Sequence, residues 1–96
     1  MPSQDHDEEE ARLLARVGRR IGELREHAGL TQANIAEAIG TTVSNYQRIE
    51  HGLQNVTVLT MARIARAIGA EPGDFFAPPQ QAERGRGRPS KRRADR

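Results

Sequence analysis

The segment from Thr31 to Gly52 constrains the fold of this chain more than any other part of it. It reads TQANIAEAIGTTVSNYQRIEHG, and its apolar residues recur at the three- and four-residue steps that place side chains on one face of a helix. These residues are Ile35, Ala36 and Ile39 in the first half, and Tyr46 and Ile49 in the second. Gly40, Thr41 and Thr42 interrupt the pattern. We therefore predict two short helices joined by a tight turn, with their apolar faces in a shared core.

Glycines and threonines mark where the helices end and begin. A glycine directly after a periodic apolar segment suits the left-handed residue that ends a helix, and a threonine just before such a segment suits the N-cap. The glycines are Gly29, Gly40, Gly52 and Gly69, and the threonines are Thr31, Thr42 and Thr57. These positions fix the register of the predicted helices.

Three further helices complete the predicted fold. The first spans about residues 9–28, the fourth spans about 58–68, and a last short turn opens at Pro72 and brings Phe75 and Phe76 onto the core. The residues expected to face inward are Leu14, Val17, Ile21, Leu24 and Ala28 in the first helix, and Val58, Met61, Ala65 and Ile68 in the fourth. The predicted fold class is all-α, with five short helices in one compact domain over residues 11–76. The ends, 1–10 and 77–96, are expected to be disordered.

Charge is distributed unevenly along the 96 residues. Residues 1–10 carry five acidic and no basic side chains, whereas the basic tail, residues 77–96, carries seven basic and two acidic ones. A basic tail favours polyanions such as nucleic acid. The alternative is a charged segment that only keeps the chain in solution.

The sequence offers no site for catalysis, a cofactor or a metal. It contains no cysteine, and none of His6, His27 and His51 stands at ligand spacing from another histidine. No Ser/His/Asp constellation or phosphate-binding glycine loop is present, so we expect no enzyme activity. The chain also lacks the roughly 20 consecutive apolar residues of a membrane span and the apolar core of a signal peptide. We therefore expect a cytoplasmic protein that does not enter a membrane.

The second helix of the Thr31–Gly52 segment carries Val43, Ser44, Gln47 and Arg48 on the face opposite its apolar residues. Small polar and basic side chains on the open face of a locked helix pair suit the reading of base edges in a DNA major groove. Arg48 can form a bidentate pair with guanine, and the alternatives are a phosphate contact or a solvated charge. Val43 can contact only a thymine methyl, or it is an ordinary half-buried helix start. Ser44 and Gln47 are equally common on any solvated helix face.

Several short motifs occur in order along the chain: Gly29-Leu30-Thr31-Gln32, Ile35-Ala36, Gly40 at the turn, Arg48-Ile49-Glu50-His51-Gly52, Ile64-Ala65-Arg66-Ala67-Ile68-Gly69 and Asp74-Phe75-Phe76. On these motifs, residues 13–76 resemble the lambda repressor-like, Cro/C1-type (XRE) helix-turn-helix family. The resemblance covers about two thirds of the chain. It implies a compact five-helix DNA-binding domain, usually a dimeric transcriptional regulator at a partly palindromic operator.

The resemblance implies a role for each matching residue. Gln32 stands where the family contacts a DNA phosphate and braces the recognition helix, and Asn45 lies nearer the edge that contacts the DNA backbone. The base-reading positions hold Thr42, Val43, Ser44 and Arg48, with Gln47 on the same open face. Arg25 and Glu50 match a pair that forms a salt bridge between the first and third helices in some members.

The chain departs from the family pattern at a few positions. Asn34 stands where a glutamate often completes a capping box, so we expect a weaker N-cap for the second helix. His51, Leu53 and Gln54 occupy a segment often rich in lysine or arginine, so we expect less affinity for the DNA backbone there. Leu59 is apolar where the family usually has a charged residue.

The basic tail contains a motif of its own. Its sequence Arg84-Gly85-Arg86-Gly87-Arg88-Pro89, followed by Lys91-Arg92-Arg93, resembles an AT-hook. Glycine lets the backbone lie deep in a narrow minor groove, and Arg86 and Arg88 would be drawn by its negative potential. The alternatives are non-specific phosphate affinity and a passive tail. The acidic stretch Asp5–Glu10 is interpreted as a solvated helix start, with folding back onto this tail as the alternative.

These observations predict a sequence-specific regulator of transcription that binds double-stranded DNA as a homodimer on the nucleoid. Each recognition helix, residues 43–51, would enter the major groove of one half-site of a palindrome. Leu59 and Phe76 are the candidate dimer contacts, because an apolar residue at a usually charged surface position indicates a covered patch. One alternative is an antitoxin that binds a partner protein and its own promoter. The other is an architectural protein that uses the basic tail on AT-rich DNA.

Overall fold

The computed structural model describes residues 4–80 of the chain. Its elements are α1 (Gln4–His27), α2 (Gln32–Ile39), α3 (Val43–Glu50), α4 (Val58–Ile68) and the 3-10 helix η1 (Pro72–Phe76). Residues 4–80 contain no strand, which confirms the all-α fold class. The fifth predicted helix is the 3-10 turn η1, so only four elements are α-helices in this range. No described helix combines the length and apolar character that crossing a membrane requires.

Helix α1 is longer than the sequence pattern predicted. It begins at Gln4 rather than near residue 9, so residues 4–10 are helical. This contradicts the disorder expected for residues 1–10 and agrees with the interpretation of Asp5–Glu10 as a helix start. No glycine or proline interrupts residues 4–16, and acidic side chains in the first turns interact favourably with the helix dipole. The side chains from His6 to Leu13 are exposed, so this part of the helix has no buried apolar face. The spacing of apolar residues therefore could not predict it. The expected disorder of the basic tail falls outside the described residues from position 81 onward.

The predicted threonine N-caps are confirmed. The Thr42 and Thr57 hydroxyls accept hydrogen bonds from the backbone N–H three residues later, each at 3.0 Å. Thr31 does the same at 2.9 Å, and Asn34 Oδ1 accepts from the Thr31 N–H at 2.8 Å. The expectation of a weaker cap before α2 is therefore wrong, because the shorter Asn34 side chain still completes the capping box.

The predicted glycine stops are confirmed as well, since all four lie at positive φ: Gly29, Gly40, Gly52 and Gly69. Gly40 shows why this matters for the site. It ends α2 at a φ of 78°, and Thr42 opens α3 two residues later. A side chain at Gly40 would strain this backbone, so the glycine sets the angle between α2 and α3.

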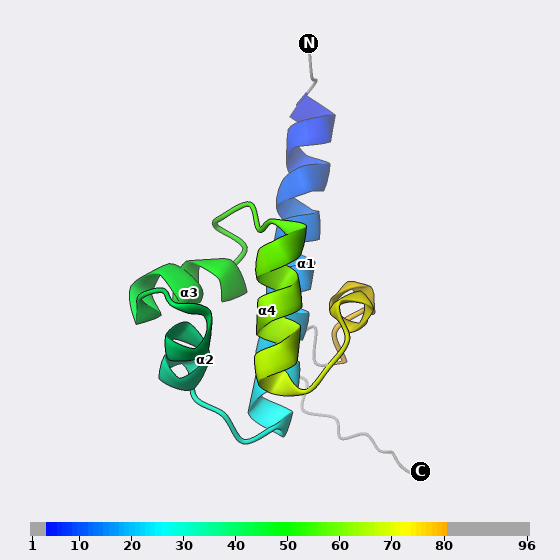
Figure 1. Cartoon of the computed structure of the whole chain (residues 1–96). Coiled ribbons are helices and arrows are strands. Elements are labelled where there is room, and N and C mark those ends of the chain that lie inside the picture. Colours follow the sequence, from blue (N-terminus) through cyan, green and yellow to red (C-terminus); the bar gives the residue numbers. More distant parts are fainter. Residues whose placement is uncertain (1–3, 81–96) are drawn as a thin grey trace.

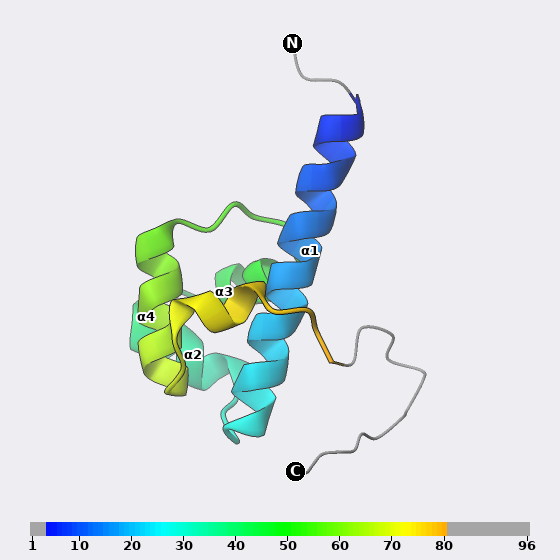
Figure 2. The ribbon, with the colours of Figure 1, turned by 90° about the vertical axis from the view of Figure 1, so that its right-hand side faces the viewer.

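The other elements lie beside the C-terminal half of α1 (Figure 1). Helix α2 packs against α3 and α4, α1 contacts α3 and η1, and η1 also contacts α4. The first turns of α1 extend beyond the other helices in both views (Figure 2). The α2–α3 pair lies on one side of the molecule, and η1 lies on the other side of α4 (Figure 1).

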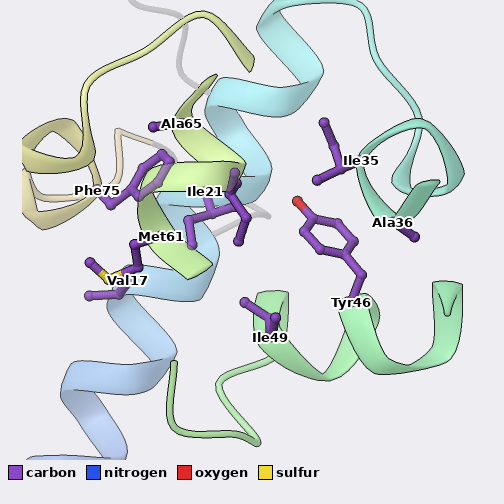
Figure 3. Packing of buried hydrophobic residues seen from close by; sticks show 10 residues of the cluster. Val17, Ile21, Ile35, Ala36, Tyr46, Ile49, Met61, Ala65 and Phe75 are labelled. Carbon is purple, nitrogen blue, oxygen red and sulfur yellow. The ribbon is translucent and has the colours of Figure 1, made fainter. Parts of the chain in front are cut away.

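All five elements contribute side chains to one core (Figure 3). Its buried members are Val17, Ile21, Ile35, Ala36, Tyr46, Ile49, Met61, Ile64, Ala65 and Phe75. Tyr46 and Ile49 are therefore core residues, as predicted. Leu14, Leu24 and Ile68 are only half-buried, and Ala28 is exposed because α1 has already ended at His27.

Two core predictions in the C-terminal half are wrong. Val58 is 77% exposed, because side chains tilt toward the helix N-terminus and the first residue of α4 projects past the end of the helix. Ile64 is fully buried, although it was not among the residues predicted to face inward. Phe76 is 50% exposed although Phe75 is fully buried. Successive residues of a 3-10 helix point about 120° apart, so only one of the two rings can face the core.

Helices α1 and α3 approach so closely at Gly18 that a side chain has no room there. An added Cβ would lie 2.5 Å from the carbonyl oxygens of both Ile49 and Glu50. A second contact of this kind is made by Gly52, where an added Cβ would lie 2.6 Å from the Cα of Ala15. These backbone contacts fix the C-terminal end of α3 against the middle of α1.

We expect Gly18→Ala to lower the free energy of unfolding by about 2 kcal/mol. Alanine gains about 1 kcal/mol in helix propensity, but overpacking here should cost about 3 kcal/mol, the upper end of its usual range, because both close contacts are with backbone carbonyls rather than flexible side chains. Urea unfolding measures the difference. Gly73→Ala is the control, because no atom lies within 4 Å of an added Cβ at that position. A Gly18→Ala variant as stable as the parent chain would contradict the close approach.

Candidate nucleic-acid interface

The face of α3 that the sequence predicted to be open is exposed in the structure. Thr42, Val43, Ser44, Gln47 and Arg48 are all exposed, with Val43 at 40%. Their exposure follows from the helix period, because Tyr46 and Ile49 turn the opposite face into the core. The structure thus brings the predicted base-reading positions together on one surface.

Asn45 belongs to the same helix but not to the same face. It is half-buried, and its Nδ2 donates a hydrogen bond of 2.8 Å to the Thr41 hydroxyl in the turn before α3. The Asn45 side chain therefore braces the turn. Its predicted contact with the DNA backbone stays a prediction.

Arg48 leans toward the segment that follows α3. One terminal guanidinium nitrogen donates to the Leu53 carbonyl oxygen at 3.2 Å. Within residues 4–80 the guanidinium makes no other hydrogen bond, so most of its five N–H donors are free for an acceptor outside the chain. The positive charge is thus held at the exposed edge of α3.

Gln32, the first residue of α2, connects α2 to α3 through both atoms of its amide. Its Nε2 donates to Glu50 Oε1 at 3.0 Å, and its Oε1 accepts from Gln47 Nε2 at 2.9 Å. Gln32 therefore contacts α3 at two points, one half-buried and one on the exposed face. This matches the bracing role that the family resemblance implied for Gln32.

The Glu50 carboxylate is the centre of these contacts. Arg25 holds it with two nitrogens, Nε at 2.6 Å from Oε2 and an outer nitrogen at 3.2 Å from Oε1. The Tyr46 hydroxyl donates to Oε2 at 2.5 Å. Arg25 also donates to the Leu30 carbonyl oxygen at 2.8 Å. The predicted Arg25–Glu50 salt bridge is confirmed, and it ties α1, the α1–α2 turn and α3 together.

The protonation of this cluster follows from its geometry. Burial alone would raise the pKa of Glu50, but hydrogen bonds from Arg25, Tyr46 and Gln32 together hold that pKa below its ordinary value. The hydrogen bond to Glu50 raises the pKa of Arg25, although burial opposes the shift. Burial, and then the bond to Glu50, raise the pKa of Tyr46. The carboxylate is therefore ionised at neutral pH and the tyrosine is not.

Sequence reasoning missed the polar role of Tyr46 and the bond between Gln32 and Gln47. Tyr46 was assigned to the core only, yet it stands four residues before Glu50, a spacing at which helical side chains meet. That spacing was the available signal. The glutamine pair is 15 residues apart and depends on how α2 and α3 are angled, so the sequence alone carried no signal for it.

The predicted minor-groove residues Arg86 and Arg88 lie outside the described residues. Among the described residues of the basic tail, the Gln80 N–H donates to Glu23 Oε1 on α1 at 3.0 Å. Within residues 4–80, no group of three or more histidine, cysteine or carboxylate side chains is arranged to hold a metal ion.

Comparisons with known proteins agree with this geometry. The family model for the helix-turn-helix domain matches residues 16–75 of the chain. The uncharacterized HTH-type transcriptional regulator y4wC of Sinorhizobium fredii is 37% identical over 62 residues, which are 65% of this chain and 43% of y4wC. This chain therefore spans less than half the length of that relative.

Two solved structures have the same arrangement of helices. One is the restriction-modification controller protein C.AhdI from Aeromonas hydrophila, with a TM-score of 0.65 and 32% identity, covering 69% of this chain and 96% of C.AhdI. The other is the clp gene regulator ClgR from Corynebacterium glutamicum, with a TM-score of 0.65 and 25% identity, covering 67% of this chain and 68% of ClgR.

We expect Glu50→Gln to change how stability depends on pH. The folded-state pKa of Glu50 is lowered, so its contribution is present above the ordinary value of 4.5 and is lost as pH falls through the folded pKa. The variant should be about 3 kcal/mol less stable at neutral pH, and the difference should shrink in acid below about pH 4.5. Urea unfolding across pH measures this.

The matched control for that experiment is Glu37→Gln, which makes the same change at an exposed position on α2. It should follow the parent curve at every pH. A Glu50→Gln variant that keeps a constant stability difference down to strong acid would contradict the ionised, hydrogen-bonded carboxylate.

Proposed function

We propose that this chain, which belongs to the helix-turn-helix family of DNA-binding transcriptional regulators, recognises a specific operator by placing α3 in the major groove. The observation that carries the proposal is the face of α3, where polar and basic groups are exposed on a helix that the Glu50 cluster holds in place. A rigid helix with short side chains can approach base edges closely.

The proposed roles follow the geometry of that face. Thr42, Val43 and Ser44 stand at the N-terminal end of α3, where free backbone N–H groups also favour a phosphate. Arg48 carries the positive charge and the donors that suit guanine. Gln32 and Asn45 would lie at the edge of the groove and contact the DNA backbone.

We propose a homodimer as the form that binds DNA. Leu59 at 61% exposure and Phe76 at 50% are large apolar residues that the rest of the described chain leaves at least half exposed. A two-fold dimer would present one α3 to each half-site of a palindrome, with the half-sites about one helical turn apart. A protein of this kind acts on the nucleoid.

The architectural alternative is favoured by one observation, the seven basic residues of the tail. A footprint of the full chain separates the two functions. A discrete palindromic footprint supports the regulator, whereas diffuse coverage of AT-rich DNA supports the architectural role and Arg86 and Arg88 as its contacts.

We expect Arg48→Ala to relax base preference at one position of the operator by about 1–3 kcal/mol, the discrimination of a bidentate arginine–guanine pair. Binding to the operator and to single-base variants, at one fixed salt concentration, measures the change. Arg63→Ala removes the same charge from α4 and should leave every preference intact. An equal loss on all sequences would show that Arg48 contacts phosphate only.

We expect Leu59→Glu to shift the chain from dimer to monomer in light scattering, because a buried unpaired charge in an interface is costly. Leu53→Glu is the control, since it places the same charge on another exposed leucine, at 59% exposure. A Leu59→Glu chain that stays dimeric would place the interface elsewhere.

A further inference from the structure

The direction of hydrogen bonds around Glu50 determines which way the amide of Gln32 points. A carboxylate has no proton and can only accept. The Gln32 atom that lies 3.0 Å from Glu50 Oε1 must therefore be the amide nitrogen. The Gln32 oxygen must then face away from Glu50, toward Gln47. Arg25 and Tyr46 donate the other three hydrogen bonds to the carboxylate. The opposite orientation of the Gln32 amide would place its oxygen against the carboxylate, so only one orientation is possible.

The orientation of Gln32 in turn determines that of Gln47. Gln32 Oε1 can only accept, so the Gln47 atom that lies 2.9 Å from it must be the nitrogen. Gln47 is exposed on the face assigned to DNA. Within residues 4–80, its Oε1 accepts no hydrogen bond, and one of its two N–H groups is unused. Gln47 therefore presents one acceptor and one donor to whatever lies against α3.

We propose that Gln47 is a specificity-determining residue for adenine, and that Glu50 acts on it as a positioning residue through Gln32. The proposal rests on the function proposed above, with α3 in the major groove. Adenine is the base that offers a donor, N6–H, beside an acceptor, N7, on its major-groove edge. That pair matches the free oxygen and the free N–H of Gln47.

Other partners fit the free groups of Gln47 less well. Guanine presents two acceptors, O6 and N7, and would need two N–H donors from Gln47, one of which Gln32 already uses. A phosphate also presents only acceptors, which would leave Gln47 Oε1 facing a negative charge. The fixed amide thus favours adenine over guanine at one position, while Arg48 suits guanine at another.

The test begins with duplexes that the full chain selects from a randomised pool. The position at which Gln47→Ala loses its preference identifies the base pair that Gln47 contacts, and we expect adenine there. Two modified duplexes then probe that base: 7-deazaadenine removes the N7 acceptor, and purine without the 6-amino group removes the donor. Each should weaken parent binding roughly tenfold, which corresponds to 1.4 kcal/mol and lies within the range for one bidentate pair. Neither should affect Gln47→Ala.

Glu50→Gln tests whether Glu50 orients Gln47 through Gln32. A glutamine at this position can donate as well as accept, so the Gln32 amide is no longer fixed. The variant should lose its preference at the Gln47 position while it keeps the preference that Arg48→Ala removes. Retention at the Arg48 position excludes general damage to α3, and circular dichroism checks that the helices are present.

The outcomes separate the two proposals. A parent chain without any sequence preference would overturn the proposed function and this inference with it. A parent chain with clear preferences, in which Gln47→Ala weakens all sequences equally or in which the two modified bases bind as well as adenine, would overturn this inference alone. A Glu50→Gln chain that keeps its adenine preference would leave Gln47 as the reader and remove the role of Glu50.

Discussion

The ion pair between Arg25 and Glu50 is the contact on which the position of α3 depends. Taking two charges out of water costs several kcal/mol for each ion, and the attraction offsets this cost only where the remaining hydrogen-bonding groups are also satisfied. Here the side chains are only 10% and 9% exposed, and the carboxylate accepts four hydrogen bonds from three residues. The pair is therefore tolerated in the interior, and it joins α1 to α3 across 25 residues of sequence.

The same contact explains two glycines that lower the helix propensity of α1. An added Cβ at Gly18 would meet the Glu50 carbonyl oxygen, and one at Gly22 would lie 3.1 Å from its carboxylate oxygen Oε1. The glycines therefore give the last turn of α3 the room to lie directly on α1. Helix propensity alone shows only that each glycine destabilises α1 by about 1 kcal/mol. The close packing of α3 on α1 explains why glycine is nevertheless present at these two positions.

The parts of the fold that local chemistry determines could be predicted from the sequence. Thr42, Thr57 and the glycine stops act through their own backbone neighbours, so their roles are the same in any context. The predictions were wrong where the burial of a side chain depends on its tertiary surroundings. Val58 follows the apolar period but lies at the end of its helix, and Phe76 shares a short turn that can bury one ring only. For the site, the sequence predicted which positions share the exposed face. It could not predict the direction of the Gln32–Gln47 bond, because that depends on the angle between α2 and α3.

The exposed first turns of α1 also have a thermodynamic consequence. Forming the first turn of an isolated helix is unfavourable, but adding residues to an existing helix is nearly neutral in free energy. The buried half of α1, from Val17 onward, is already helical because it packs in the core. The unfavourable free energy of forming a first turn therefore does not arise again for the exposed residues before it. Residues 4–13 are therefore an elongation of a helix that tertiary packing has already nucleated. They can gain or lose helical turns from Gln4 inward, in small steps of free energy, while the core and the α3 surface stay unchanged.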